Sequence, residues 1–243
     1  MNNPSNTSIR QLGTILSVWA HPDDESYSCA GIMALAVENG QKVVCITATK
    51  GELGVQYAKR WPPDQLADIR AEEMEEALDI IGVNDHHWLG YADGGCKQIP
   101  VAEAAAKLKQ YIEQYSPDTI LTFGPEGLTG HDDHCSVSRW VDEATKDTDI
   151  AVYHAVELRE IYEAMKRADD EFNIFFNIDK PPIVEENECD LLLCLPDSLL
   201  IKKYQSLCAM PSQTEAMFTK FGKDNICKMV CSEAFVRAKD KTF

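Results

Sequence analysis

The sequence predicts an α/β protein whose mostly parallel sheet is covered by helices on both faces. Two observations carry this prediction. Short β-rich runs alternate with longer helical segments up to about residue 155, and most of the short runs are apolar throughout. Strands that are apolar on both sides are typical of parallel sheets buried between helix layers. The chain has 243 residues and no internal repeat, low-complexity stretch or linker, so we expect a single domain over 1–243.

Each element follows from its local pattern. Apolar, β-rich runs predict strands at residues 14–20, 42–48, 87–89, 119–123 and 151–155. Helical spacing of apolar residues predicts helices between them, at residues 31–38, 64–81, 101–115 and 133–146. The C-terminal part after about residue 158 is less regular. It contains a candidate strand at 173–178, the apolar run DLLLCL and a predicted helix at 196–209.

The charge and cysteine content narrow the class of protein. With 23 Lys+Arg against 40 Asp+Glu, the formal net charge is -17. Nucleic acids and anionic membrane surfaces require basic patches, so we expect neither as a partner, whereas a homo-oligomer is compatible with this charge. The polar N-terminus lacks the basic start and long apolar stretch of a signal peptide. Nine cysteines without a CxxC pair, several of them inside apolar runs, are typical of reduced thiols in a cytoplasmic protein.

The segment that follows the first predicted strand concentrates charge. His21, Asp23, Asp24 and Glu25 fall within five positions. Neighbouring carboxylates repel one another and lose hydration where a loop meets a sheet edge, and a bound cation would relieve both penalties. His21 and Asp24 are three residues apart, so one turn can direct both toward one zinc or iron(II) ion. The alternative is a helix N-terminus at which Asp23 or Asp24 is the N-cap.

A second cluster follows the predicted strand at 119–123. The segment GHDDH brings His131 and His134 together with acidic residues just before a predicted helix. In an open α/β sheet, ligands bind at the carboxyl ends of the strands. If the two strands are neighbours, His21, Asp24 and one of the later histidines form a three-ligand site. Three protein ligands leave a position for water, which is typical of catalytic zinc and lowers the pKa of that water toward about 7.

The motif AHPDDE, together with GLTGHDDH, resembles the LmbE-like, or PIG-L, family of metal-dependent N-deacetylases over about residues 14–145. The family includes the deacetylases of glycosylphosphatidylinositol, mycothiol and bacillithiol synthesis. The resemblance implies a Rossmann-like fold and a zinc-type enzyme that hydrolyses a linear amide. Beyond residue 145 only scattered features fit, such as Ser212-Gln213-Thr214.

Carried over by position, the resemblance implies that His21, Asp24 and His134 bind the metal, which is Zn²⁺, Fe²⁺ or another divalent cation. It makes Asp23 the general base. The chemistry agrees with this assignment, because Asp23 adjoins a metal ligand and could take a proton from the activated water.

The second motif supplies the remaining catalytic candidates. The resemblance makes His131 the group that stabilises the oxyanion or protonates the leaving amine, with Asp133 orienting its ring. Family members usually carry proline where this chain has Asp132. We expect Asp132 to point to solvent.

Two further residues are candidates for substrate binding. Arg70 lies in the middle of the apolar stripe of the helix predicted at 64–81, where a charge is costly unless it is paired or reaches a cleft. It is similar to a family arginine that contacts substrate, and Asp93, in GYADGG, matches a loop acid that binds sugar hydroxyls. The alternatives are an exposed first turn for Arg70 and an ordinary turn residue for Asp93. The remaining histidines are expected to be structural: His86, His87 and His154.

The predicted function is the metal-dependent removal of an N-acetyl group from an N-acetylglucosamine-like sugar or glycoconjugate. Two alternatives remain open at this point. The substrate could be a thiol conjugate or another non-sugar amide, or the chain could be a metal-binding α/β module without catalytic activity. Comparing hydrolysis rates across such amides separates the first alternative, and bound metal without turnover identifies the second.

Overall fold

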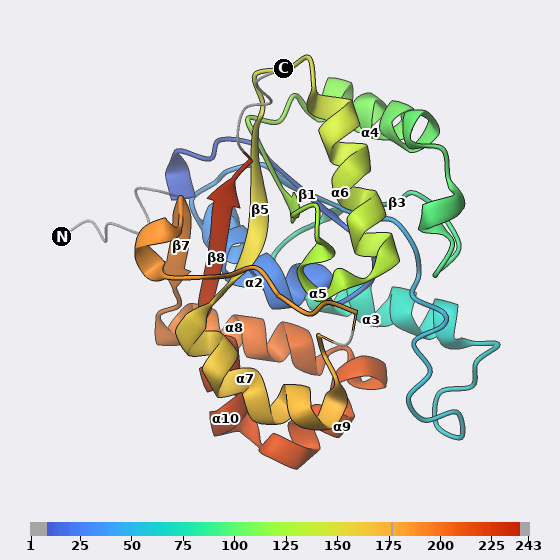
Figure 1. Cartoon of the computed structure of the whole chain (residues 1–243), viewed down its shortest axis with the longest axis vertical. Helices are drawn as coiled ribbons and strands as arrows, with labels where there is room; N and C mark the ends of the chain where they lie inside the picture. The colour runs from blue at the N-terminus through green and yellow to red at the C-terminus, as the bar shows by residue number, and fades with distance from the viewer. Residues whose placement is uncertain (1–8, 176, 239–243) are drawn as a thin grey trace.

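A computed structural model, which describes residues 9–175 and 177–238, confirms the α/β architecture (Figure 1). The central sheet has the strand order β3-β2-β1-β4-β5-β8-β7, with β6 beside β5. Strands β3, β2, β1, β4 and β5 are parallel, whereas β8 runs antiparallel to both β5 and β7. Strands β1 and β4 are neighbours, so the ends of the two strands that precede the histidine motifs lie side by side.

The parallel strands are short and mostly buried. Every residue of β1, β2 and β4 is buried, as expected from their apolar sequences. Where the rings of Trp19 and Phe123 meet, at the ends of β1 and β4, they pack edge to face with centroids 4.8 Å apart. The bounds of the parallel strands are β1 Ile15–Trp19, β2 Val43–Thr47, β3 Asp85–Trp88, β4 Thr119–Phe123 and β5 Ala151–Leu158.

Helices cover both faces of the sheet, as predicted (Figure 1). On one face α2 (Asp24–Glu38) packs with α3 (Leu66–Ile81), and on the other α4 (Val101–Tyr115) packs with α6 (Asp132–Thr145). Helix α2 begins seven residues before the predicted start at residue 31. The polar segment DESYS does not continue the apolar pattern, and Cys29, with φ −150° and ψ 19°, kinks the helix between the two parts.

The C-terminal part contains more regular structure than its sequence pattern indicates. Helix α8 (Asp197–Cys208) confirms the helix predicted at 196–209, and the apolar run DLLLCL contains strand β7 (Leu191–Cys194). The strand expected at 173–178 is wrong, because residues 173–175 form the end of a helix and a turn. Residue 176 lies outside the described residues, as does the N-terminal segment 1–8. The elements that were not predicted are α7 Arg159–Phe172, β6 Ile183–Val184, α9 Pro211–Phe221, α10 Lys223–Met229 and β8 Ser232–Arg237.

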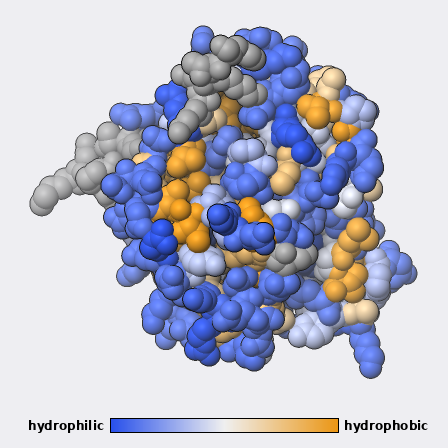
Figure 2. All heavy atoms as spheres, viewed as in Figure 1, coloured by the Kyte–Doolittle hydropathy of each residue, from blue (hydrophilic) through white to orange (hydrophobic). Residues whose placement is uncertain are grey.

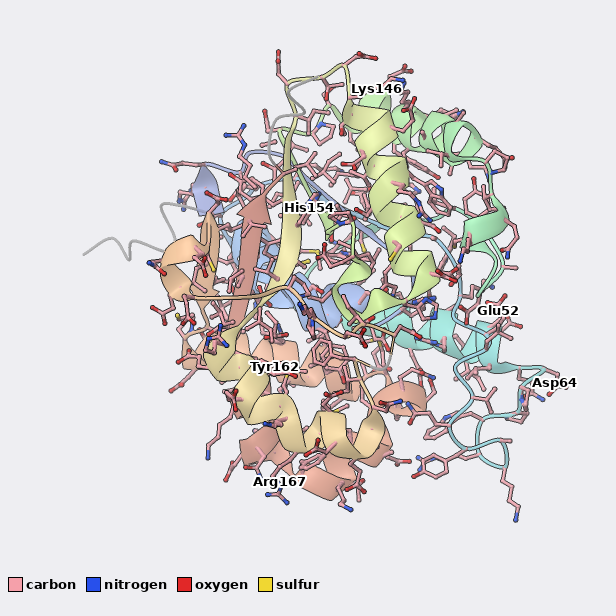
Figure 3. All side chains as sticks on the ribbon, viewed as in Figure 1. Glu52, Asp64, Lys146, His154, Tyr162 and Arg167 are labelled. Carbon is pink, nitrogen blue, oxygen red and sulfur yellow. The ribbon has the colours of Figure 1, made fainter. Side chains whose placement is uncertain are left out.

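Helix α7 was missed because most of its residues are polar. Its sequence REIYEAMKRADDEF nevertheless has Ile161, Met165 and Ala168 at helical spacing, which is a usable signal. Figure 3 shows Tyr162 of this helix directed inward and Arg167 directed away from the molecule. The Tyr162 ring lies 5.5 Å from the ring of Phe175, so the chain folds back across α7.

A buried ion pair joins the C-terminal strand to the first helix. Glu233 of β8 accepts hydrogen bonds from the backbone N–H groups of Gly31 and Ile32, at 2.8 and 2.7 Å, and from Lys203 of α8, at 2.8 Å. Lys203 and Glu233 are both fully buried side chains. Breaking such a pair leaves an uncompensated buried charge, so it locks β8, α2 and α8 into one arrangement.

C-terminal helices partly cover the edge of the sheet at which the parallel strands have their carboxyl ends. Figure 1 shows β5 running into α7, with α9 and α10 gathered beside it. The face displayed in Figure 2 is mostly hydrophilic, with apolar side chains gathered over β5 and β8. No helix within the described residues is long and apolar enough to cross a membrane.

Candidate metal centre and active site

The first histidine motif forms the junction between β1 and α2. Asp23 occupies the N-cap position with φ 105° and ψ −32°, which is an unfavourable backbone conformation for a residue with a side chain. Its side chain makes no capping hydrogen bond, so the N-cap alternative does not account for it. Instead, its backbone N–H donates to Glu25 Oε2 at 3.2 Å, and the buried Glu25 thereby holds the strained turn.

The second motif forms the junction between β4 and α6 through the short helix α5 (Gly127–Gly130). His131 is the N-cap of α6, and its Nδ1 accepts a hydrogen bond from the backbone N–H of Asp133 at 3.2 Å. His134 follows in the first turn of the helix, and its ring stacks on Phe123 with centroids 4.1 Å apart. The last residue of β4 thus orients the imidazole that the next helix presents.

The three predicted metal ligands converge. His21 Nδ1 lies 3.2 Å from His134 Nε2, and the Asp24 carboxylate lies 3.6 Å from the first atom and 3.4 Å from the second. Ligand atoms about 2.1 Å from a tetrahedral zinc ion are separated by about 3.4 Å. The spacing of these three groups therefore fits one divalent ion.

The hydrogen bonds around the two rings determine which nitrogens are free to bind a cation. His134 Nδ1 donates to the carbonyl of Gly127 at 2.9 Å, which leaves the lone pair on Nε2. His21 Nε2 faces Asp93 Oδ1 at 3.0 Å and Asp133 Oδ2 at 3.3 Å, which leaves the lone pair on Nδ1. Two lone pairs and a carboxylate are thus directed at one point, with outer partners of the kind that orient metal ligands.

The charges around the rings favour a cation. Burial opposes charge on His21, but hydrogen bonds with Asp133, Asp24 and Asp93 raise its pKa well above the ordinary value. A divalent ion bound at Nδ1 would take the place of the proton that these acids hold there. Burial lowers the pKa of His134 to about 4, so this ring is neutral, as a metal ligand must be. Although burial opposes ionisation of Asp24, the neighbouring histidines hold its pKa below the usual range.

Asp133 differs from the expectation. It was predicted to orient His131, but its carboxylate contacts His21 Nε2 and accepts hydrogen bonds from the N–H groups of Gly94, at 2.8 Å, and Cys96, at 3.1 Å. Only its backbone N–H reaches His131 within the described residues. The reason is the helix start: His131 caps α6 in an extended conformation, while the Asp133 side chain points inward from the first turn and is fully buried.

His131 stands beside the ligands. Its ring centroid lies 4.8 Å from that of His21 and 5.1 Å from that of His134, and the side chain is half-buried. An Nδ1 atom that accepts a hydrogen bond carries no proton, so the neutral ring holds its proton on Nε2. Asp132, in contrast, is 63% exposed and pairs with Lys97 at 3.1 Å, as expected for a residue that points to solvent.

Asp23 lies next to the ligands with Arg70 behind it. Burial raises the pKa of Asp23 to about 7, although the guanidinium of Arg70, 3.4 Å away, opposes the shift. Arg70 is only 4% exposed, which excludes an exposed first turn, and it donates to the carbonyls of Gly51, at 2.7 Å, and Pro22. Gly51 has φ +65°, and a Cβ there would lie 2.2 Å from Arg70 Nη1, so glycine is required for this close approach.

Asp93 lies behind His21 in the loop after β3. Its Oδ2 accepts a hydrogen bond from the N–H of Leu53 at 2.8 Å, and its own N–H donates to Glu52 at 3.0 Å. Figure 3 places Glu52 near the start of α3. Although burial opposes ionisation, the hydrogen bond from His21 lowers the pKa of Asp93 to about 2. The structure brings Asp93 and Arg70 to the metal ligands, while substrate contact by either stays a prediction.

A cavity of about 250 Å³ adjoins the ligands. Asp23, Asp24 and His134 contribute to its wall. Sequence reasoning missed most of the other residues that line it, because they come from the weakly patterned C-terminal part. The sequence singled out Gln213 only as part of Ser212-Gln213-Thr214, a segment similar to one in the family. Glu157 lies near the end of an otherwise apolar strand, and an acid at that position could have indicated a residue that faces a site.

The residues expected to be structural have protein partners. His86 Nε2 lies 3.0 Å from Thr47 Oγ1, and His87 Nε2 lies 2.6 Å from the hydroxyl of Tyr115. His154 lies on β5 (Figure 3). Among the described residues, two groupings place their ligand atoms close enough to hold a metal: His21 with His131 and His134, and His21 with Asp93 and Asp133.

Comparisons with known proteins point to one family. The model of the PIG-L family, described as GlcNAc-PI de-N-acetylase, matches residues 16–145. A 1D-myo-inositol 2-acetamido-2-deoxy-alpha-D-glucopyranoside deacetylase of Kineococcus radiotolerans is 34% identical over 53% of this chain and 44% of its own length. The protein of the same name in Acidothermus cellulolyticus is 30% identical over 72% of this chain and 70% of its own length.

A solved structure shares the fold. The N,N'-diacetylchitobiose deacetylase of Pyrococcus horikoshii superimposes with a TM-score of 0.67 at 18% identity, covering 95% of this chain and 85% of that one. This likeness extends through the C-terminal part. The chain spans about half the length of the first curated relatives that it matches.

Proposed function

We propose that this chain, which belongs to the PIG-L family, is a metal-dependent hydrolase that removes the N-acetyl group from an N-acetylglucosamine-like sugar or glycoconjugate. The observation that carries the proposal is the convergence of His21, Asp24 and His134 beside Asp23 and His131. The names of the relatives, which are deacetylases of an N-acetylated sugar, support the same reaction.

Three groups would hold the ion: His21 through Nδ1, His134 through Nε2 and Asp24 through its carboxylate. Two imidazoles and one carboxylate suit zinc, and also iron(II) or another divalent cation. When bound, the ion would supply a Lewis acid that polarises the amide carbonyl and lowers the pKa of water. Asp93 and Asp133 keep the proton of His21 on Nε2 and so hold the ring in the tautomer that can bind the ion.

Asp23 is the general base in this proposal. Water forms the new C–O bond, and its proton passes to Asp23, whose pKa of about 7 suits a group that accepts and returns a proton near neutral pH. Arg70 holds the carboxylate in place, with its guanidinium anchored by Gly51 and Pro22. Arg70 therefore acts as a positioning residue for Asp23.

His131 completes the reaction. Its Nε2–H donates a hydrogen bond to the developing oxyanion. The proton that Asp23 took from water then passes to the leaving nitrogen. The amide C–N bond breaks, and the nitrogen takes up a proton, so that one amide and one water yield acetic acid and a primary amine. The cap hydrogen bond from Asp133 to Nδ1 keeps Nε2 as the donor.

The two alternatives lead to different results in one assay. Protein purified with chelator and then loaded with Zn²⁺ or Fe²⁺ is incubated with N-acetylglucosamine, its glycosides, an N-acetylated thiol conjugate and a simple N-alkylacetamide, and acetate release is measured. We expect release from the sugars, in the loaded protein only. Turnover confined to the thiol conjugate or the N-alkylacetamide would show that the protein is an amidase for non-sugar substrates. Tight metal binding without turnover of any amide would overturn the enzymatic function.

The free cysteines of the described structure support the further proposal that the protein works in a reducing compartment such as the cytoplasm. The sheet combines strands from both ends of the chain, which supports a single domain.

A further inference from the structure

The cavity beside the ligands is larger than the group that the proposed reaction removes. Its volume is about 250 Å³, whereas an apolar cavity of about 150 Å³ already holds a benzene molecule. An acetyl group ends in a single methyl, which cannot fill such a space. The part of the substrate that can fill it is the part bonded to the amide nitrogen.

The position of Asp23 agrees with this placement. In the proposed reaction Asp23 returns its proton to the leaving nitrogen, so the nitrogen must lie within hydrogen-bond reach of this carboxylate. Asp23 lines the cavity, whereas His131, which faces the oxyanion, is not among the described residues that line it. The carbonyl oxygen therefore lies toward His131, and the nitrogen with its substituent lies toward the cavity.

The wall of the cavity combines apolar side chains with acids. Strands β5 and β8 and helices α7, α9 and α10 supply most of the apolar side chains, among them three methionines and two phenylalanines. No lysine or arginine among the described residues lines this space. Such a wall gives the cavity a negative potential, which favours a positively charged ligand. Four carboxyl groups line it: Asp23, Asp24, Glu157 and Glu233.

Three of these carboxyl groups already have close partners. Asp24 faces the two ligand rings, and Asp23 lies 3.4 Å from the guanidinium of Arg70. Glu233 lies 2.8 Å from the buried lysine of α8. Glu157, near the end of β5, is the remaining acid, so it is the one that can take a partner from the substrate.

The surroundings of Glu157 leave its charge without a close cation. Within the described part of the chain, no Lys, Arg or His side chain forms an ion pair with it. Lys203 acts on it only at longer range, because its ammonium group donates to Glu233 at 2.8 Å and to the carbonyl of Tyr27 at 2.6 Å. Burial raises the pKa of Glu157 to about 7 despite Lys203. A positively charged group in the cavity would offset the penalty that burial imposes on this carboxylate.

We infer that the part of the substrate bonded to the leaving nitrogen carries an ammonium group, which pairs with Glu157 in the cavity. The inference rests on the proposed hydrolysis and names its substrate class, an N-acetylated aminosugar conjugate with a second, free amine. The bond changes are those of the proposed reaction. Glu157 is thus a specificity-determining residue, while the methionine side chains adapt to the methylene groups that lead to the ammonium.

The first test compares matched substrates. The loaded enzyme is given aminoalkyl glycosides of N-acetylglucosamine, from aminoethyl to aminohexyl, each beside the alkyl and hydroxyalkyl glycosides of the same length. Salt at about 0.15 M screens the attraction of the acidic surface for cations. At the length that reaches Glu157, kcat/KM for the aminoalkyl glycoside should exceed that of both neutral partners by at least about tenfold. No preference at any length, or an equal gain from the hydroxyl group, would overturn the inference.

The second test removes the charge. Glu157→Gln keeps the shape of the side chain and should reduce the preference for the aminoalkyl over the alkyl glycoside to at most about threefold. This preference is a ratio within one variant, so a general loss of activity does not affect it. Glu160→Gln, at an exposed position at the start of α7, is the matched control and should keep the preference. Equal preferences in the two variants contradict the inference.

Thermal unfolding shows whether each variant is folded. If Glu157→Gln unfolds, Glu157→Met takes its place, since it removes the charge and keeps a side chain of similar length. The expected loss of preference is the same.

Binding separates this inference from the proposed function. Titration calorimetry of the loaded protein with the aminoalkyl and alkyl glycosides of glucosamine, which are reaction products, measures occupancy without turnover. At least about tenfold tighter binding of an aminoalkyl glycoside, lost in Glu157→Gln, supports the inference even if no amide is hydrolysed. Equal binding within every pair, with normal acetate release from N-acetylglucosamine, overturns the inference and leaves the proposed function standing.

Discussion

The regions on either side of residue 150 contribute different things to the site. The first region, β1 to α6, supplies every candidate ligand and proton-transfer group from the junctions of fully buried strands with helices. The second, β5 to β8, supplies an apolar wall and a buried ion pair. The family model matches only the first region. The candidate ligands and proton-transfer groups thus come from one part of the chain and most of the adjoining cavity wall from the other, so each part can be changed alone.

The largest expected effect is in the first region, at Asp23, the proposed general base. Asp23→Asn keeps the shape of the side chain but cannot accept a proton, so kcat should fall by about 10²–10⁴-fold. KM should change little. Acetate release by Asp68→Asn, at an exposed carboxylate, is the control. A loss below tenfold in Asp23→Asn would remove Asp23 from the mechanism.

In the second region the largest effect should be on stability. Lys203→Met leaves Glu233 buried without its cation and should lower the free energy of unfolding by about 3–5 kcal/mol. The adjacent Lys202→Met breaks an exposed pair with Glu38 and should lower it by at most about 1 kcal/mol. Urea unfolding of both variants measures the difference. Equal losses would show that the buried pair does not hold β8 to α2.

Glu157 in the cavity wall should make the stability of the fold depend on pH. Burial raises the pKa of Glu157 from 4.5 to about 7, against the opposing effect of Lys203. The folded chain retains this proton up to about pH 7, whereas the unfolded chain releases it above about 4.5, so this contribution to stability is lost as the pH rises through that window.

Glu157→Gln cannot ionise, and relative to wild type it should gain up to about 3 kcal/mol in stability between pH 5 and pH 8. Urea unfolding at the two pH values measures the gain. The same change at the exposed Glu160 is the control and should give no gain. Parallel pH profiles for wild type and Glu157→Gln would contradict the raised pKa.

The smallest expected effect concerns the contact of Asp133 with His21. Asp133→Asn weakens the hold on His21 Nε2–H and should reduce metal affinity by about 10–100-fold. Asp132→Asn, one residue away and exposed, should leave the affinity unchanged. Competition with a chromogenic chelator measures both. If Asp133→Asn binds metal as well as wild type, its carboxylate does not orient the ligand.

Local pattern was sufficient to predict much of the first region. Strand β4 and helix α4 have the predicted bounds, because their apolar spacing is unambiguous. Local pattern predicted that His21, Asp24 and one of the later histidines meet if their two strands are neighbours, and the family resemblance singled out His134. The structure places β1 beside β4. The bounds of β4 and α4 depend on local spacing alone, whereas the meeting of the two motifs depends on which strands are neighbours in the sheet.

By itself, the sequence determined the α/β class, the two junctions and the residue types that can hold a divalent ion, because strand alternation and motif spacing are local properties. The tertiary structure was needed to place the Asp133 carboxylate against His21 rather than His131, to bury Arg70 behind Asp23, and to form a mostly apolar cavity beside the ligands. These features depend on side-chain directions and on packing between segments far apart in the chain, such as α2 and β8, which no local periodicity records.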